Sequence, residues 1–539
     1  MTYDALDTSS NALARGLANH GVKKGDRVAV SLGNNLEYAT ATYALFKLGA
    51  ILVPLNPAFN ALQVIAALSH LSATHLIIGA ETNLSRKAPR SNIPLLTHLV
   101  PNLKGNRLES ELVPSLRKVI LVDNSLGRVD CSELKATSPY KHVLEDGGSG
   151  RPLAGQDLHQ DDIVNIQFTS GTTSMPKAAS LTHRNILNNG KSIGDRMLLT
   201  PEDIVCCPPP LFHCFGCILG YMATATHGSS IIFPSEAFNP HATLAAARDE
   251  HATALYGVPT MFVSELELIG DSPSHQFHPS DFTTLRTGIA AGSVIPAELM
   301  RKLHRLLNLT ELTICYGMTE TSPVSAMTTT DDPLEKRVET VGRLLPHVET
   351  KIVDVNDRSK ILGVGERGEV VTTGYNVMKG YWGDEIKTRE VLVEDHDGKK
   401  WMHTGDEGSM DEEGYVRITG RIKDLIIRGG ENIHPLEIEN ALFAHPAIAE
   451  ASVVGLPDDR YGEVVAAFVI RQQASSEIPR LSAHDVREWV RQRLSNHLSP
   501  KYVFFIDSAV LPRTPSGKVQ KFKLRDMGQE MQKAGLGLK

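Results

Sequence analysis

A short segment rich in hydroxyl side chains carries the clearest chemistry in this sequence. Residues 169–177 read Thr-Ser-Gly-Thr-Thr-Ser-Met-Pro-Lys, and they follow the alternating, strand-like residues 163–168. Such a loop offers backbone N–H groups and hydroxyls to polyphosphate oxygens, with the ammonium of Lys177 as a counter-charge. It is not a Walker loop, because Gly-x4-Gly-Lys-Ser/Thr is absent from the sequence. By itself the segment could be a Ser/Thr-rich surface turn, but the motifs that follow favour a phosphate loop.

Two carboxylates and an arginine further along suit a nucleotide and its metal ion. Glu320 closes the run Tyr316-Gly-Met-Thr-Glu320 after a predicted strand, where a carboxylate beside phosphate is a fitting Mg²⁺ ligand. The alternative is a solvated Glu at a helix start, where a carboxylate is favoured in any case. Asp406, in Thr404-Gly-Asp406, can accept hydrogen bonds from ribose hydroxyls, and Arg421 can supply a matching donor. Gly405-Asp406 alone would be an ordinary turn.

Six motifs stand in a fixed order, and together they resemble those of the adenylate-forming superfamily. This superfamily includes acyl-CoA synthetases, adenylation domains and luciferases. After the loop at 169–177 come Pro210-Leu-Phe-His213, Tyr316-Gly-Met-Thr-Glu320, Thr404-Gly-Asp406, Gly420-Arg421-Ile-Lys423-Asp424 and Pro515-Ser-Gly-Lys518. The resemblance spans about residues 10–525 and departs at Ser174 and Ala178, where the family usually has Gly. Both replacements are small residues, so we expect the loop still to wrap phosphate.

The resemblance implies an AMP-forming acid–thiol ligase that uses ATP, Mg²⁺ and CoA. It implies catalytic roles for Lys518, His213, Thr319 and Glu320, with Glu320 also the metal ligand. The nucleotide-binding residues that it implies are Thr169, Ser170, Gly171, Thr172, Thr173, Ser174, Met175, Pro176, Lys177, Ala291, Gly292, Ser293, Tyr316, Gly317, Asp406 and Arg421. By composition alone, Lys518 would be a solvated lysine of the C-terminal tail.

Two half-reactions, separated by a rotation of a C-terminal domain, are also implied by the resemblance. Lys423 occupies the hinge position, and Lys518 acts only in the adenylate-forming arrangement. Gly429, Gly430 and Glu431 would then present flexible backbone to the pantetheine arm of CoA. The alternative for these three residues is an ordinary glycine turn before a helix.

His213 bears on the choice of acid. Amino-acid-adenylating relatives usually carry Asp in this motif, so His213 favours an acid without an α-amino group and would gate the acyl pocket; a buried structural His is the alternative. The expected pocket is apolar, with glycines that leave space, and its lining includes Phe215, Gly216, Val258, Gly288 and Ala290.

The sequence most resembles medium-chain fatty acyl-CoA synthetases and fungal acyl-CoA ligases of siderophore and toxin pathways. The predicted substrate is therefore a medium-chain or a branched, hydroxylated aliphatic acid, with mevalonate as one alternative. An enzyme that loads a carrier-protein phosphopantetheine would keep the same motifs. A non-catalytic member of the fold would usually lose Lys518, Glu320 or Asp406, and all three are present.

Composition excludes several other classes of protein. The chain of 539 residues has 41% hydrophobic and 22% charged residues and a net charge of −7, as expected of a globular enzyme without nucleic acid as its main partner. Its six cysteines are too few for a disulfide framework. Cys206, Cys207, Cys214 and Cys217, with His213, could form a zinc site, but buried packing cysteines are favoured because the segment is apolar.

The sequence contains few signals for the cellular location or the oligomeric state of the protein. The best membrane-span candidate, residues 216–233, contains His227 with Thr, Ser and Gly, so a buried core element is favoured. The start of the chain lacks the pattern of a signal peptide. We expect a cytoplasmic enzyme, or a peroxisomal one if a targeting segment is missing upstream of Met1. Nothing indicates an oligomer.

The pattern of elements predicts an α/β protein with parallel-rich sheets, a small β-barrel-like subdomain over 363–381 and a mobile α+β C-terminal domain. The predicted domains are residues 1–422, which bind ATP and the acyl group, and residues 423–539, which carry Lys518. Residues 83–155 are expected to be a surface excursion around a short strand at 118–122. Other predicted elements are helices at 11–20, 36–48, 259–268, 298–307, 434–443 and 483–496, and strands at 27–32, 51–55, 252–256, 285–289, 312–316, 448–455 and 463–471.

Overall fold

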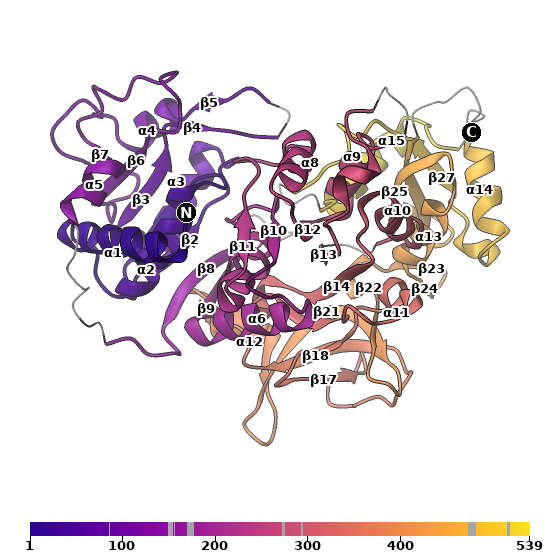
Figure 1. Cartoon of the computed structure of the whole chain (residues 1–539). Coiled ribbons are helices and arrows are strands. Elements are labelled where there is room, and N and C mark those ends of the chain that lie inside the picture. The colour runs from indigo at the N-terminus through magenta and orange to yellow at the C-terminus, as the bar shows by residue number, and fades with distance from the viewer. Residues whose placement is uncertain are drawn as a thin grey trace.

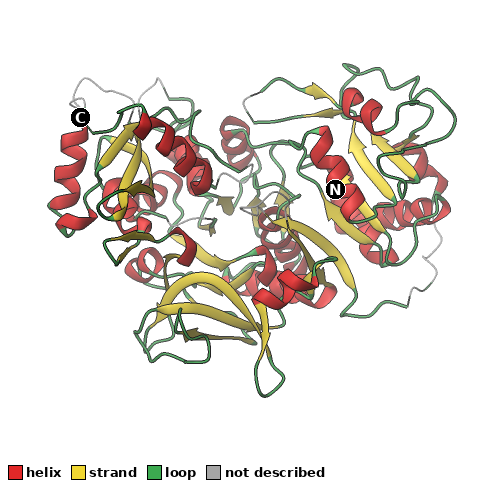
Figure 2. Ribbon diagram, turned by 180° about the vertical axis from the view of Figure 1, so that it is seen from behind, coloured by secondary structure: helices red, strands yellow, loops and turns green. Residues whose placement is uncertain are grey.

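The computed structural model of this chain describes residues 1–85, 87–148, 155, 157–169, 177–271, 275–292, 295–472, 481–514 and 518–538. Two parallel-rich sheets and an antiparallel sheet form a large N-terminal domain, and a smaller sheet with its helices forms a C-terminal domain (Figure 1). Figures 1 and 2 both place the two termini in opposite halves of the molecule. The predicted α/β class is confirmed, whereas the domain boundary at residue 422 stays a prediction.

The first sheet has the strand order β19-β9-β8-β2-β1-β3-β6-β7. Its strands are parallel from β8 to β7, and β9 and β19 are added antiparallel at one edge. The strands are β1 (Arg27–Ser31), β2 (Ile51–Pro54), β3 (His75–Gly79), β6 (Lys118–Val122), β7 (Ser138–Pro139), β8 (Ile163–Thr169), β9 (Lys177–Thr182) and β19 (Gly380–Tyr381).

Helices cover both faces of this sheet, which explains why its inner strands are apolar throughout. One face packs on α1 (Tyr3–Asn19), α2 (Leu36–Leu48) and α5 (Tyr140–Asp146), the other on α3 (Ala61–His70) and α4 (Ile93–Leu99). Helix α2 has the predicted bounds because Asn35 caps its start and Gly49, at φ 66°, ends it. Helix α1 begins earlier than residue 11 because Thr2 caps it by accepting a hydrogen bond from Ala5.

Residues 83–155 do not form the surface excursion that was expected. They supply two strands of the first sheet, β6 and β7, and half of the two-stranded ribbon of β4 (Glu81–Thr82) and β5 (Arg90–Ser91). Leu96, Leu99 and Val113 of this segment are buried in the core. Their irregular spacing follows neither a helix nor a strand period, so this part of the core could not be recognised from the sequence pattern.

The second sheet has the order β11-β10-β12-β13-β14-β15-β16 and is parallel as far as β14. Its strands are β10 (Ile204–Cys206), β11 (Ser230–Ile232), β12 (Ala254–Gly257), β13 (Thr287–Ala290), β14 (Glu311–Gly317), β15 (Val324–Met327) and β16 (Arg343–Leu344). The helical elements of this region are α6 (His183–Arg196), η1 (Phe215–Met222), α7 (Ala223–His227), α8 (Pro240–Asp249), α9 (Pro259–Leu266), η2 (Pro279–Phe282), α10 (Ala297–Leu307), η3 (Thr319–Thr321) and α11 (Leu334–Glu339).

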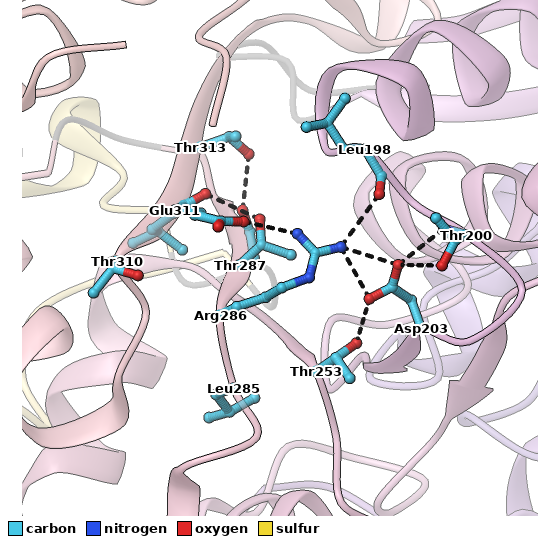
Figure 3. A network of polar contacts seen from close by, with 12 residues as sticks. Leu198, Thr200, Asp203, Thr253, Leu285, Arg286, Thr287, Thr310, Glu311 and Thr313 are labelled. Carbon is cyan, nitrogen blue, oxygen red and sulfur yellow. Dashed lines mark hydrogen bonds and ion pairs between the residues drawn. The ribbon is translucent and has the colours of Figure 1, made fainter. Parts of the chain in front are cut away.

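A charged network ties together the N-terminal ends of these parallel strands (Figure 3). The guanidinium of Arg286, before β13, donates to both oxygens of Asp203 at 3.0 Å and to Glu311 at 2.7 Å. Thr253, before β12, donates to Asp203 at 2.7 Å. Because parallel strands share a direction, their C-terminal ends lie together at the opposite edge, where ligands bind in open α/β sheets.

Of residues 363–381, expected to form a barrel-like subdomain, strand β19 pairs with the first sheet, whereas β18 belongs to a five-stranded antiparallel sheet. Its strands are β17 (Val348–Val353), β18 (Gly368–Gly374), β20 (Leu392–Glu394), β21 (Lys400–Met410) and β22 (Val416–Arg421), with α12 (Glu385–Val391) before β20. Figure 2 shows this sheet as a curved layer below the two parallel-rich sheets.

The C-terminal domain follows the turn η4 (Ile422–Asp424) and has its own buried core. Its strands are β23 (Ile426–Arg428), β24 (Glu431–Ile433), β25 (Ile448–Asp458), β26 (Gly462–Arg471) and β27 (Tyr502–Phe505), and its helices are α13 (Pro435–Phe443), α14 (Ala483–Arg491), η5 (Asn496–Leu498) and α15 (Lys521–Lys533). Helix α14 ends before residue 496, the predicted end, because the chain turns into η5.

Among the described residues, no helix has both the length and the apolar character needed to span a membrane. The candidate at residues 216–233 begins in the π-helical turn η1, whose residues are all buried, and ends in strand β11. It is therefore a core element, as expected.

Candidate active site

The C-terminal ends of the second sheet bring several predicted residues to one edge. Val258 follows β12, and Ala291 and Gly292 follow β13. Tyr316 is the last residue but one of β14, with Thr319 and Glu320 in the next turn. Gly317 has a packing reason of its own, because a Cβ there would lie 1.7 Å from the carbonyl oxygen of Pro323. Ser293 lies outside the described residues.

Asp406 sits at the centre of a polar cluster at this edge. Its Oδ1 lies 2.7 Å from Nε of Arg421, its cross-strand partner on β22. Its Oδ2 accepts a hydrogen bond of 2.7 Å from the hydroxyl of Tyr316. Burial and the neighbouring Asp406 carboxylate raise the pKa of Tyr316, so this phenol stays a donor. Asp406 is only 5% exposed, and a buried carboxylate held by a hydrogen bond and an ion pair is fixed in direction.

The phosphate-loop segment begins and ends on a tight strand pair. Thr169 closes β8 and Lys177 opens β9, and the two residues are direct partners across the antiparallel ladder. The intervening Ser170, Gly171, Thr172, Thr173, Ser174, Met175 and Pro176 lie outside the described residues. The ammonium of Lys177 lies 4.8 Å from the ring centre of Tyr381.

Tyr381 is a site residue that sequence reasoning missed. Its hydroxyl donates to Oε1 of the buried Glu320 at 2.8 Å, while its ring lies beneath Lys177. One side chain therefore connects the predicted phosphate ligand to the predicted metal ligand. The aromatic pair Tyr381-Trp382 after Gly380 was a signal, but nothing in its spacing pointed to Glu320.

His213 precedes the π-helical turn η1 and is held as a neutral imidazole. Its Nδ1 accepts a hydrogen bond of 3.2 Å from the backbone N–H of Phe215. Burial, and then the positive charge of Lys518, lower the pKa of His213 to about 4. Because Nδ1 is the acceptor, the single proton of the neutral ring lies on Nε2.

Lys518 reaches this edge from the C-terminal domain. The positive charge of Lys518 acts on His213, and Arg421 and Asp406 act on Lys518 in turn. Although the residue is exposed to solvent, the surrounding protein displaces water from the ammonium, and this desolvation, followed by the charge of Arg421, lowers its pKa. The backbone N–H of Lys518 donates to Oγ1 of Thr514 at 3.1 Å. Pro515, Ser516 and Gly517 of the same motif lie outside the described residues.

The predicted hinge and CoA residues follow the last strand of the N-terminal domain. Lys423 lies in η4, where burial and Arg421 lower its pKa. Gly429 and Gly430 are the two turn residues of the β23–β24 hairpin, with φ of 61° and 88°, so this hairpin favours glycine whether or not CoA binds there. Glu431, the next residue, lies 3.4 Å from His497 of its own domain.

The residues predicted to line the acyl pocket do not share one face of the second sheet. Phe215 and Val258 pack with Tyr256, Ile289 and Ala291 on one face. Ala290 points to the other face and packs with Phe262. Successive residues of a strand point to opposite faces, so Gly288 and Ala290, two residues apart on β13, share a face that is opposite to the face of Ile289.

The two glycines expected to leave space in the pocket are packed against backbone instead. A Cβ on Gly216 would lie 2.3 Å from the carbonyl oxygen of Pro210, and one on Gly288 would lie 2.0 Å from that of Leu255. Both glycines therefore permit a close approach of two chain segments, and neither opens room for a substrate.

Four cysteines near the site are packing residues. Cys206, Cys207, Cys214 and Cys217 are free and buried in apolar clusters. Burial raises the pKa of Cys214 to about 12, although a hydrogen bond with Thr319 opposes the shift. In the part of the chain that the structure describes, no group of three or more His, Cys, Asp or Glu side chains could hold a metal ion.

Comparison with known families assigns the chain. The family described as AMP-binding enzyme matches residues 1–382, and its C-terminal domain matches residues 437–518. The chain belongs to the AMP-binding enzyme family. Within this family, the acyl-CoA ligase sidI of Aspergillus fumigatus is 44% identical over 532 residues, covering 97% of this chain and 86% of that protein.

Other members of the AMP-binding enzyme family agree in sequence and in fold. The mitochondrial medium-chain acyl-CoA ligase ACSF2 of Rattus norvegicus is 36% identical, covering 98% of this chain and 83% of that protein. The crystal structure of ATP-bound MatB from Rhodopseudomonas palustris superposes with a TM-score of 0.80 at 27% identity, covering 98% of this chain and 94% of that one.

Proposed function

We propose that this protein activates a medium-chain or a branched, hydroxylated aliphatic carboxylic acid with ATP and transfers the acyl group to CoA. The class of enzyme follows from the family and its relatives: the chain is an acyl-CoA ligase of the AMP-forming type. The placement of Lys518 against the edge that carries Asp406, Arg421 and His213 is the observation that supports adenylation at this site. A lysine on a separate domain reaches the cluster predicted to hold the nucleotide.

In the first half-reaction, a carboxylate oxygen of the acid attacks the α-phosphorus of ATP, and pyrophosphate leaves. This step brings two anions together, so fixed positive charge is worth most where negative charge develops. Lys177 and the hydroxyls of the 169–177 loop would hold the β- and γ-phosphates, and Lys518 would stabilise charge between the acid and the α-phosphate. Asp406 would accept hydrogen bonds from the ribose hydroxyls, with Arg421 beside it. The Tyr316 ring and the small residues Ala291 and Gly292 would lie against adenine.

A magnesium ion fits the carboxylate of Glu320. The carboxylate is buried at the C-terminal end of a parallel strand and held by Tyr381. Mg²⁺ is commonly bound through one or two carboxylates together with substrate phosphates, which agrees with the lack of a multi-residue cluster among the described residues. When bound, the ion would neutralise phosphate charge.

In the second half-reaction, the thiol of CoA attacks the acyl carbonyl and AMP leaves. A rotation about Lys423 would withdraw Lys518 and bring Gly429, Gly430 and Glu431 to the adenylate. His213, neutral and with its proton on Nε2, would border the acyl group. It presents no anion to a substrate ammonium, which favours an acid without an α-amino group.

Pyrophosphate exchange and product analysis test this proposal. With ATP, Mg²⁺ and CoA, a panel of C4–C12 straight-chain acids, mevalonate and other hydroxylated branched acids, and amino acids should separate the substrate classes. We expect AMP, pyrophosphate and an acyl-CoA thioester from an aliphatic acid. ADP and phosphate as products would contradict the adenylate mechanism. Transfer to a phosphopantetheinylated carrier protein, without transfer to free CoA, would favour the alternative acceptor.

A further inference from the structure

An irregularity in strand β21 places the carboxylate of Asp406. The register between β18 and β21 pairs Glu369 with Glu407 and Val371 with His403, so residues 404–406 lie opposite the single residue 370. Gly405 lies inside this bulge with φ 69°, a left-handed conformation that glycine adopts without strain. A bulge of this kind turns side chains away from the regular alternation of a strand. Asp406 thereby points to Tyr316 and Arg421.

The carboxylate of Glu369 closes this bulge from the opposite strand. Its Oε1 accepts a hydrogen bond of 3.1 Å from the backbone N–H of Gly405, and its Oε2 lies 2.9 Å from Nδ1 of His403. Glu369 and His403 are 3% and 7% exposed, so these bonds are shielded from water. Two acceptor atoms of one side chain thus fix the residues on each side of Thr404. Thr404 adds an internal brace, since its hydroxyl donates to the carbonyl of Val370 at 2.7 Å and accepts from the N–H of Asp406 at 3.1 Å.

Glu369 stays charged in this position. Burial by itself raises its pKa, but the hydrogen bond and charge of His403, the Gly405 N–H and the charge of Arg358 outweigh burial and lower it. Arg358 lies 3.5 Å from Oε2 and is half exposed, so it supports the charge without touching the bulge. A charged acceptor makes shorter and stronger hydrogen bonds than a neutral one.

We propose that Glu369 is a positioning residue for the nucleotide: it holds the bulge at residues 404–406 and thereby aims Asp406 at the ribose hydroxyls. This inference rests on the proposed role of Asp406. It predicts that Glu369, which is not expected to touch ATP, controls how strongly the enzyme distinguishes a ribose from a deoxyribose.

The experiment compares KM for ATP, 2′-deoxy-ATP and 3′-deoxy-ATP in pyrophosphate exchange, with thermal melting as a measure of folding. For the wild type we expect a preference for ATP over at least one deoxy analogue of about ten-fold or more, since a hydrogen bond to a charged acceptor is lost. Glu369→Ala should lose most of this preference: KM for ATP rises about ten-fold while KM for the sensitive analogue changes little. A loss of stability alone would affect all nucleotides alike.

Three further variants sharpen the test. Glu369→Gln keeps an acceptor for Gly405 and should retain most of the preference, whereas Glu369→Asp, with its carboxylate withdrawn by one methylene, should reduce it. Arg358→Gln changes only the exposed neighbour and should behave as the wild type. If Glu369→Ala does not fold, Glu369→Asp decides the question.

Two results overturn the inference, and they can be told apart. An undiminished preference for ATP in folded Glu369→Ala or Glu369→Asp, with the preference lost in Asp406→Asn, removes the role of Glu369 alone. Equal KM for all three nucleotides in the wild type removes the ribose role of Asp406, and the role of Glu369 with it.

Discussion

His434 of the C-terminal domain lies 3.1 Å from Glu407 of the N-terminal domain, measured from Nε2 to Oε2. Both side chains are largely buried, at 11% and 12% exposure, and Glu407 also accepts a hydrogen bond of 2.8 Å from Thr419. Glu407 directly follows Asp406, and His434 precedes helix α13 beyond the predicted hinge. The contact therefore joins the two domains beside the site in the arrangement that brings Lys518 to Asp406.

Removing this contact should favour the second half-reaction over the first. A contact of this kind between two polar side chains contributes about 1 kcal/mol, equivalent to about a five-fold change in an equilibrium. We expect His434→Ala to lower the ratio of adenylation rate to thioester-forming rate by up to that factor. The adenylation rate is measured by pyrophosphate exchange, and the thioester rate by transfer from a premade acyl-adenylate. His434→Gln, which keeps a donor, is the matched control, and adding Glu407→Ala to His434→Ala should have little further effect. Equal losses in both steps would contradict the prediction.

Lys518→Ala should impair adenylation selectively. Loss of one preorganised cation at developing charge typically costs about two to three orders of magnitude in rate. Transfer to CoA from a premade acyl-adenylate should proceed at close to the wild-type rate, because the lysine would be withdrawn in that step. Single-turnover measurements of both steps check this.

Two further variants serve as comparisons for Lys518→Ala. Lys521→Ala removes a nearby lysine that pairs with Glu439 within its own domain at 2.8 Å, and should change neither step. Lys423→Pro fixes φ at the hinge position and should slow the thioester step more than adenylation. The domain-alternation proposal fails for this chain if Lys518→Ala and Lys423→Pro each damage both steps to the same degree.

Gly288→Ala should destabilise the fold and leave the choice of acid unchanged. Its new Cβ would lie 2.0 Å from the Leu255 carbonyl, and such overpacking costs about 1–3 kcal/mol or more. Phe215→Ala, by contrast, removes a large side chain from the face that also carries Val258 and Ile289, and should favour longer acids, at about 0.8 kcal/mol for each additional buried methylene. Thermal melting and a chain-length profile of both variants check this. A shifted profile in Gly288→Ala, or an unchanged one in Phe215→Ala, would place the pocket elsewhere.

Glu265 should make stability fall as pH rises. The carboxyl is fully buried on α9, neither oxygen has a hydrogen-bond partner among the described residues, and burial raises its pKa to about 8. Between its unfolded pKa near 4.5 and its folded pKa near 8, the native state keeps a proton that the unfolded state has lost. Stability therefore declines across this range and levels off above it.

Glu265→Gln isolates the effect of this proton. At about 1.4 kcal/mol for each unit of pKa difference, the variant should gain a few kcal/mol relative to the wild type between pH 5 and 8. The melting temperatures of both proteins are compared across this pH range, and a constant difference between them would show that Glu265 does not titrate as expected.

Features that depend on residues close together in the chain could be predicted from the sequence. Helix α2 is framed by Asn35 and Gly49, and strands β1, β13 and β14 by apolar runs and turns, so their existence followed from backbone and side-chain preferences within a few residues. The motifs that hold Asp406, Arg421 and Lys518 are likewise short, and their order along the chain was sufficient to indicate an AMP-forming ligase.

Tertiary structure decided how distant segments meet. Tyr381 touches Glu320 because β19 pairs with β9, and His434 touches Glu407 because the C-terminal domain lies where it does. The space beside Gly216 and Gly288 is filled by the backbone of residues 210 and 255, which no local pattern could reveal. A sequence specifies which side chains stand at a strand end, but contacts across a large separation depend on the pairing and packing of whole elements. For that reason the chemical class could be predicted from the sequence, whereas the positioning of its residues could not.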